Sequence, residues 1–74
     1  MQRKGARVVI VFVNGKEQIL PGPMTVEEFL SFRGLEAALV VIEINLGIVK
    51  REQWAVHVIA ENDRLEILRF VGGG

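Results

Sequence analysis

The alternation of apolar and polar stretches predicts that the folded part of the chain opens with a β-hairpin. Residues 8–13 are an unbroken apolar run of mostly β-branched side chains, which fit the half-buried surface of a strand. Asn14 and Gly15 interrupt the run, and residues 16–20 resume as a second strand. A type I′ turn requires positive φ at both central residues, and an Asn-Gly pair adopts that conformation readily. We therefore expect an antiparallel hairpin over residues 8–20.

A short amphipathic helix is predicted over residues 25–33. Thr25 is followed three residues later by Glu28, a capping box in which each side chain satisfies a backbone N–H group at the start of the helix. Gly34 suits the left-handed residue that ends a helix. Apolar side chains at helical spacing form one face, namely Val26, Phe29 and Leu30. We expect this face to pack on a sheet.

Three more strands follow the helix. We expect them at residues 39–44, 48–50 and 64–71, where apolar and β-branched residues gather between turn residues. Residues 51–60 lack a clean period, so we interpret them as a connection held in place by the large side chain of Trp54. The predicted order is ββαβββ. One helix packed across a mixed sheet is a small α+β domain of the β-grasp type.

Composition limits the chain to one small domain. Its 74 residues are 50% hydrophobic and can form a single core, so we expect one domain over 1–74, with 1–7 as a loose lead-in and 71–74 as a flexible reactive tail. The 9 basic and 9 acidic residues cancel, which argues against nucleic acid or an anionic membrane as the partner. The apolar runs are too short to span a bilayer, and the lack of cysteine fits a reducing compartment. We therefore expect a cytoplasmic protein.

The last predicted strand carries apolar side chains on both faces. Side chains alternate along a strand, so Leu65 and Ile67 share one face while Leu68 and Phe70 share the other. A single helix covers one face of a sheet, which leaves the second pair for a partner. We expect Leu68, Phe70 and the adjoining Val71 to form a partner-docking face. Two alternatives remain open: the preceding connection folds over this face, or two copies of the chain pair through it.

The sequence ends in three glycines, Gly72, Gly73 and Gly74. Glycine lets one backbone approach another closely, so a glycine carboxylate that enters a partner's active site is the candidate reactive group. A frayed end without a chemical role is the alternative. We expect no catalytic side chain, because the sequence lacks cysteine and a serine–histidine pair. We also expect no metal site, because His57 stands alone and is interpreted as a surface residue.

Several local motifs occur here in an order shared with one known family. They are Val-Asn-Gly at 13–15, Leu-Pro at 20–21, Thr-Val at 25–26, Gly-Leu at 34–35, Val-Lys-Arg-Glu-Gln-Trp at 49–54, and Asn-Asp-Arg-Leu-Glu-Ile at 62–67 leading into Phe-Val-Gly-Gly-Gly at 70–74. From about residue 8 onward the chain resembles the sulfur-carrier proteins of thiamine biosynthesis (the ThiS family), which have a ubiquitin-like β-grasp fold. It departs from them at Asn45, which is followed by Leu46 where the family usually has glycine. Leucine is unfavourable at positive φ, so we expect this turn to be built differently.

The resemblance implies a chemistry for the C-terminus. In this family an activating enzyme uses ATP and Mg²⁺ to adenylate the C-terminal glycine, here Gly74, and sulfur then displaces AMP to give a thiocarboxylate. The implied partners are that adenylating enzyme, a sulfur donor such as a cysteine desulfurase, and thiazole synthase as the acceptor. The protein would then be a carrier and not an enzyme, and it would bind no cofactor of its own.

Other functions remain open beside the sulfur carrier for thiamine. The small subunit of molybdopterin synthase uses the same tail chemistry and also ends in Gly-Gly. A ubiquitin-like modifier would be joined through its terminal glycine to lysine side chains of other proteins. A β-grasp interaction module would use its surface and have no tail chemistry.

Overall fold

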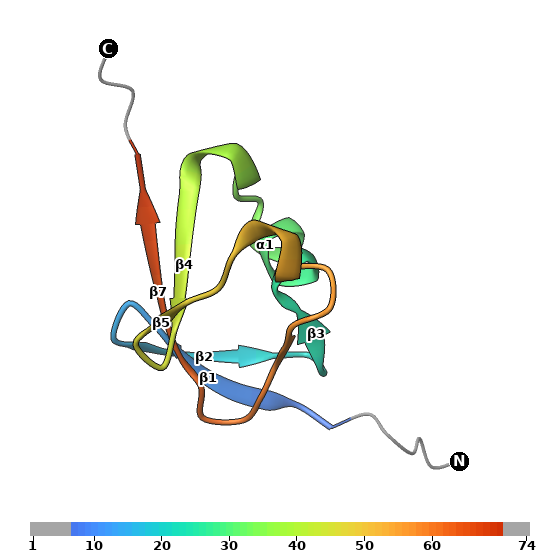
Figure 1. Ribbon diagram of the computed structural model, residues 1–74. Helices are drawn as coiled ribbons and strands as arrows, with labels where there is room; N and C mark the ends of the chain where they lie inside the picture. The colour runs from blue at the N-terminus through green and yellow to red at the C-terminus, as the bar shows by residue number, and fades with distance from the viewer. Residues whose placement is uncertain (1–6, 71–74) are drawn as a thin grey trace.

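The computed structural model describes residues 7–70, and Figure 1 shows a mixed sheet with one helix packed across it. The order of strands in the sheet is β2-β1-β7-β4-β5. These strands are β1 (Val9–Val13), β2 (Lys16–Leu20), β4 (Val40–Ile44), β5 (Gly47–Ile48) and β7 (Arg64–Arg69). The neighbours β1 and β7 run parallel, while the other neighbouring pairs are antiparallel. The predicted α+β fold of the β-grasp type is confirmed.

The first hairpin forms as predicted. Val13 of β1 lies opposite Lys16 of β2, so the turn consists of Asn14 and Gly15. Their φ angles are 52° and 84°, both in the positive range that a type I′ turn requires. The register places Val9, at the start of β1, opposite Leu20 at the end of β2, and both side chains are buried.

Capping residues fix both ends of the helix α1 (Val26–Arg33), as predicted. The backbone N–H of Glu28 donates to Thr25 Oγ1 at 3.1 Å, and the backbone N–H of Thr25 donates to Glu28 Oε1 at 2.9 Å. At the other end Gly34 has φ 69°, the left-handed conformation that ends a helix. A 3₁₀ turn, η1 (Ala37–Leu39), then leads into β4, which therefore begins one residue later than the predicted strand.

One hydrophobic core lies between the helix and the sheet. It contains the predicted helix face of Val26, Phe29 and Leu30. The strands contribute every second residue, so that β1 and β4 each alternate between fully buried and half-buried positions. The other strand residues in the core are Leu20, Ile59 and Leu65. Val49 and Trp54 join them from the segment after β5, which is Gly47–Ile48 and not the predicted strand 48–50. The opposite face of the sheet is left without a covering layer in residues 7–70.

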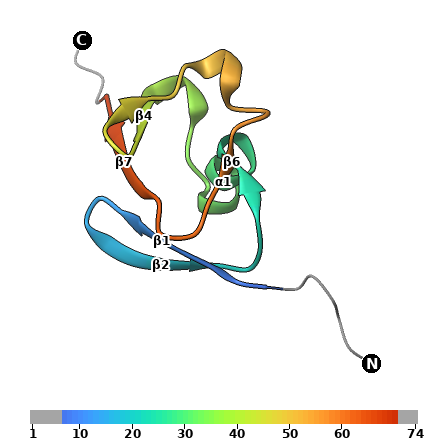
Figure 2. The ribbon, with the colours of Figure 1, turned by 60° about the horizontal axis from the view of Figure 1, so that its bottom comes forward.

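The connection after β5 is more ordered than its irregular sequence suggests. It contains a 3₁₀ turn, η2 (Arg51–Gln53), and a short strand β6 (Val58–Ile59) that pairs with β3 (Met24–Thr25) just before the helix (Figure 2). Trp54 is 6% exposed, and its Nε1–H donates to the carbonyl of Val49 at 2.9 Å. Trp54 thus anchors the connection, as predicted. The β3–β6 pairing was not predicted, because two residues are too few to produce a period of alternation.

The turn between β4 and β5 corrects one expectation. Asn45 and Leu46 have φ angles of 51° and 73°, so the turn keeps the positive-φ geometry despite the leucine. The side chain of Asn45 secures it, because its Nδ2 donates to Asp63 Oδ1 at 3.0 Å and its Oδ1 accepts from the backbone N–H of Arg64 at 3.0 Å. Leu46 is 92% exposed, so its side chain gains little from burial while its backbone is held in an unfavourable region.

We predict that Leu46→Gly stabilises the domain. Glycine removes the steric penalty of a positive φ, which is about 1–2 kcal/mol, but loses more backbone entropy on folding, so the net gain in unfolding free energy should be about 1 kcal/mol. The corresponding rise in melting temperature is roughly 4–8 °C for a domain of this size. Leu46→Ala is the matched control, since it removes the same side chain but keeps the strained backbone. Equal melting temperatures for the two variants would contradict this account of the turn.

Candidate functional site

The last described strand, β7, and the residue that follows it carry two of the candidate docking residues, Leu68 and Phe70. Leu65 is 1% exposed and Ile67 is half-buried, whereas Leu68 is 48% and Phe70 is 61% exposed. The predicted alternation of the two faces is therefore present in the structure. Val41 of β4 lies directly opposite Leu68 and points to the same face. We refer to Val41, Leu68 and Phe70 as the apolar strip.

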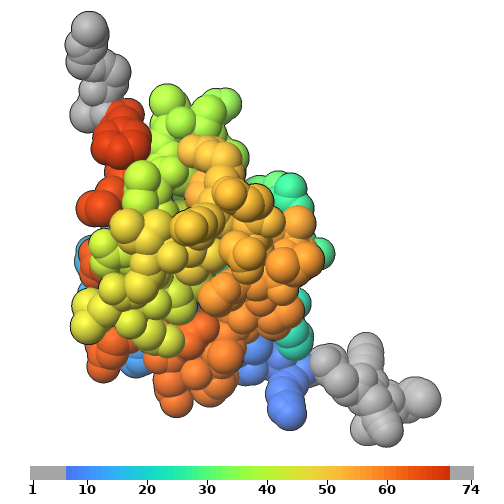
Figure 3. Space-filling model, in the orientation of Figure 1, coloured from blue at the N-terminus to red at the C-terminus, as the bar shows by residue number. Residues whose placement is uncertain are grey.

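The connection does not cover the apolar strip. It packs on the helix side of the sheet, where the N–H of Glu27 donates to the carbonyl of Trp54 at 3.1 Å and the N–H of Val26 donates to the carbonyl of His57 at 3.0 Å. Figure 3 shows the yellow to orange surface of this segment, which covers the front of the molecule and leaves the red end of β7 exposed at its margin. One of the two alternatives left open by the sequence is thus wrong: the connection folds over the core and not over the strip.

Acidic side chains border the strip on the same face. Glu43 lies opposite Glu66 across the β4–β7 ladder, immediately next to the Val41–Leu68 pair. Like charges placed directly opposite each other are unfavourable in an isolated sheet. This pair was not identified from the sequence, because it depends on the register between strands that are more than twenty residues apart in the chain.

Asn14 holds the strand that leads to the C-terminus. Its backbone N–H donates to the carbonyl of Leu65 at 2.8 Å, and its Oδ1 accepts from the N–H of Ile67 at 2.8 Å. Its Nδ2 also donates to the carbonyl of Ile67, at 3.4 Å. The sequence identified Asn14 as a turn residue and gave no signal of this second role, since its partners lie more than fifty residues away.

The remaining candidate site residues lie outside the described part of the chain. These are Val71, the fourth residue from the end, and the glycines Gly72, Gly73 and Gly74. Phe70, the last described residue, donates its backbone N–H to the carbonyl of Leu39 at 2.9 Å. The reactive role of the glycines stays a prediction from the sequence.

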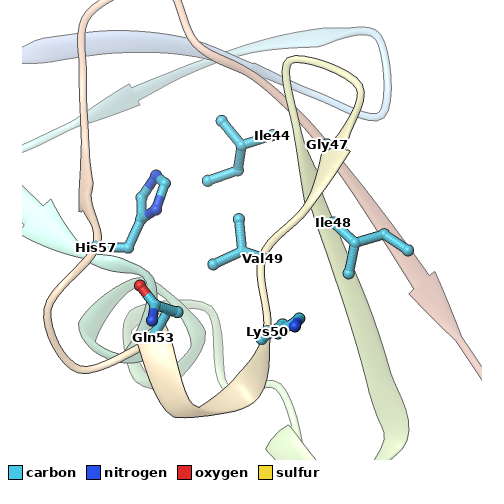
Figure 4. A pocket seen from close by; sticks show the side chains of 7 residues that line it. All are labelled: Ile44, Gly47, Ile48, Val49, Lys50, Gln53 and His57. Carbon is cyan, nitrogen blue, oxygen red and sulfur yellow. The ribbon is translucent and has the colours of Figure 1, made fainter.

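A second surface feature is a depression of about 480 Å³ beside β5. Figure 4 shows Ile44 and Val49 forming apolar walls, with the side chains of Gln53 and His57 directed toward the same hollow. His57, expected at the surface, is half-buried. In the described part of the chain, no three His, Cys, Asp or Glu side chains gather as a metal site would require. The depression lies at the end of β4 away from the apolar strip.

Arg51 has a structural role. Its guanidinium donates to the carbonyl of Ala37 at 2.8 Å and lies 4.8 Å from the centre of the Trp54 ring. It therefore ties the connection to the turn before β4. Across residues 7–70, no helix combines the length and apolar character needed to cross a membrane.

Comparison with known proteins adds to this geometry. The model of the ThiS family matches residues 10–74. A thiazole synthase of Paramagnetospirillum magneticum is 39% identical over 62 residues, which are 84% of this chain and 19% of that protein. The sulfur carrier protein ThiS of Escherichia coli is 36% identical over 50 residues, which are 68% of this chain and 76% of that protein. The chain thus spans about a fifth of the length of the thiazole synthase it matches and most of the length of the carrier.

A solved structure agrees with the fold. The crystal structure of a thiamine biosynthesis protein (ThiS) from Geobacter metallireducens is 32% identical and superposes with a TM-score of 0.78, covering 89% of this chain and 100% of that one. Family match, relatives and fold agree over almost the whole chain, and on these grounds the chain belongs to the ThiS family.

Proposed function

We propose that this protein carries sulfur as a thiocarboxylate on Gly74 and donates it to thiazole formation in thiamine biosynthesis. The observation that carries the proposal is the exposure of Leu68 and Phe70 in the apolar strip, at the end of the chain segment that leads to the C-terminal glycines. Membership of the ThiS family supports the same proposed function. The proposed surface and the proposed reactive group are thus adjacent in the chain.

The proposed chemistry needs activation of the C-terminal carboxylate. A carboxylate is a resonance-stabilised anion and a poor electrophile. Attack of its oxygen on the α-phosphorus of ATP releases pyrophosphate and forms an acyl-adenylate, and a sulfur nucleophile then displaces AMP. ATP and Mg²⁺ would be bound by the adenylating partner, and sulfur would come from a donor such as a cysteine desulfurase. The carrier would supply the carboxylate and the surface by which the partner holds it.

The apolar strip offsets part of the cost of placing the tail in an active site. Ordering three glycines costs about 3–6 kcal/mol. Complete burial of a leucine or phenylalanine contributes about 1.5–3 kcal/mol, and Leu68 and Phe70 have roughly half of their surface left to bury. Their combined contribution is then about 2 kcal/mol. The partner must therefore make further contacts close to the tail.

Thiazole synthase is the acceptor that we propose. The support is that a protein bearing this name contains a segment 39% identical to this chain within a much longer polypeptide. A second thiazole synthase, from Magnetococcus marinus, shows 30% identity over 64 residues, which are 20% of its length. Joining a carrier-like segment to a synthase in one chain is expected when the two act on the same intermediate, because the link raises their effective concentration.

We predict that Leu68→Glu or Phe70→Glu abolishes adenylation while the domain stays folded. Each side chain is about half exposed in the free protein, so a charge there is solvated, whereas in a complex it would be buried without a partner. Pyrophosphate exchange measures adenylation and thermal melting measures folding. Val56→Glu, at a 71% exposed position on the connection, is the control. Unfolding of the Leu68 or Phe70 variants would show that these residues belong to the core.

We predict that Gly73→Ala lowers adenylation about a hundredfold with little change in melting temperature. A methyl group in a narrow channel can cost about 2–3 kcal/mol, and each 1.4 kcal/mol is about tenfold in rate. One residue added after Gly74 should abolish the reaction, because the glycine carboxylate becomes a peptide carbonyl. Pyrophosphate exchange is the measurement, because adenylation releases pyrophosphate. Adenylation of the extended chain at the wild-type rate, without trimming, would refute the role of Gly74.

We predict that the protein restores growth without thiamine to a strain lacking its own thiamine sulfur carrier. The same gene with the Gly74 codon deleted should fail, because the tail would end one residue short of the reactive centre. Growth with and without added thiamine is the measurement. A parallel strain lacking the small subunit of molybdopterin synthase tests the alternative, and rescue of that strain alone would reverse the assignment.

A further inference from the structure

The two edges of β7 are paired over different lengths. Along one edge β4 accompanies the strand throughout, from Leu65 opposite Ile44 to Arg69 opposite Val40. Along the other edge β1 pairs with the first part of the strand, through Arg64 and Leu65. Figure 1 shows β4 beside the upper half of β7, with no strand on its other side. The half of β7 nearer the C-terminus is therefore an open sheet edge.

Asn14 marks the point where pairing on this edge stops. The hairpin turns back at Asn14. The side chain of Asn14 bonds to both backbone groups of Ile67 and so takes the place of the next residue that β1 would supply. The last bond on this edge is thus made by a side chain and not by a strand. Beyond Ile67, the hairpin supplies nothing more to β7 in the described residues.

Arg69 is the next residue whose backbone faces the open edge. Phe70 donates its N–H to Leu39 on the β4 side, and successive residues of a strand direct their backbone groups to opposite edges. The N–H and C=O of Arg69 accordingly point away from β4. Outside the strand ladders, none of the backbone hydrogen bonds within residues 7–70 involves either group, and Arg69 is exposed. An unpaired N–H and C=O at a strand edge can pair with another extended chain.

We propose that an extended main-chain segment of the adenylating partner pairs with β7 at Arg69 as an added strand, in the position that β1 leaves empty. This inference rests on the proposed function. The open edge lies directly before the C-terminal segment and is continuous with Leu68 and Phe70 of the apolar strip. Strand addition gives affinity through main-chain hydrogen bonds and fixes register through alternate side chains. Pairing here would set the distance from the folded domain to Gly74, so that the carboxylate meets the nucleotide.

The other edges of the sheet fit this role less well. The β2 edge carries the exposed charged residues Lys16 and Glu17, and charged side chains discourage strand pairing. It is also separated from β7 by β1. The β5 edge has two residues, which offer little backbone to a partner. The open edge at Arg69 is both unpaired and next to the proposed reactive end.

The test compares Arg69→Pro with Arg69→Ala. Proline removes the N–H that faces the open edge but keeps the bonds between β7 and β4, because Arg69 does not donate to β4, and proline is tolerated at such edge positions. Alanine removes the same side chain and keeps the N–H. The adenylating enzyme is purified from the source cells. The fractions that contain it are identified by pyrophosphate exchange that requires the wild-type chain. We expect kcat/KM for Arg69→Pro to be at least tenfold lower than for Arg69→Ala, at equal melting temperature.

A second measurement covers the case in which proline disturbs the fold. Amide hydrogen exchange of wild-type protein follows the Arg69 N–H, which should exchange rapidly in the free chain and become protected in the complex. An ester at the Leu68–Arg69 linkage, introduced by joining a synthetic C-terminal peptide, replaces the same N–H by oxygen without a proline ring. The ester variant should lose activity as the proline variant does.

The results separate this proposal from the proposed function. Equal rates for the proline and alanine variants, or rapid exchange of the Arg69 N–H in the complex, would overturn the strand pairing and leave the carrier role intact. Protection of the same N–H in concentrated free protein, together with dimerisation, would identify a second copy as the occupant and overturn the proposal. Absence of any adenylation of the wild-type chain would overturn the proposed function, and the pairing with it.

Discussion

The parallel pairing of β1 with β7 is the contact on which the rest of the structure depends. It joins the N-terminal hairpin to the β4–β5 half of the sheet. Its bonds include Asn14 N–H to the carbonyl of Leu65 at 2.8 Å and Phe12 N–H to the carbonyl of Asp63 at 2.9 Å. A parallel pair cannot be closed by a tight turn and needs a crossover, which the helix and the long connection provide. The core forms between that crossover and the sheet, so the fold, the buried face and the exposed face all follow from this pairing.

The two faces of the sheet differ in how far they are covered. On the helix side, Leu65 and Ile42 are almost completely buried, and their packing holds the strands in register. On the opposite side, β4 and β7 present apolar residues that no element of residues 7–70 covers, with Glu43 and Glu66 beside them. In residues 7–70 one α-helix packs on the sheet, and it covers one of the two faces. The second face is therefore left out of the core.

The features that the sequence predicted most accurately are those that depend on residues adjacent in the chain. The hairpin turn, the capping box and Gly34 each depend on a few adjacent residues, and alternation along β7 correctly placed Leu68 and Phe70 on the exposed face. Contacts between distant segments were missed: the β3–β6 pair, the acidic pair and the bonds from Asn14 to Ile67 all depend on register. Local preference also failed at Leu46, where the side chain of Asn45 fixes a turn that leucine disfavours. For the candidate site, the face was predictable, whereas the open edge of β7 could not be seen until the end of β1 was placed against it.

The parallel arrangement of β1 and β7 also has a mechanical consequence. The chain enters the sheet at the start of β1 and leaves it at the end of β7, and these strands are neighbours that run in the same direction. A force that pulls the C-terminal end away from the N-terminal end therefore slides the two strands past each other. Their hydrogen bonds lie across the direction of pull and share the load together, instead of opening one after another as in a zipper. The domain is thus built to resist tension applied between its two ends.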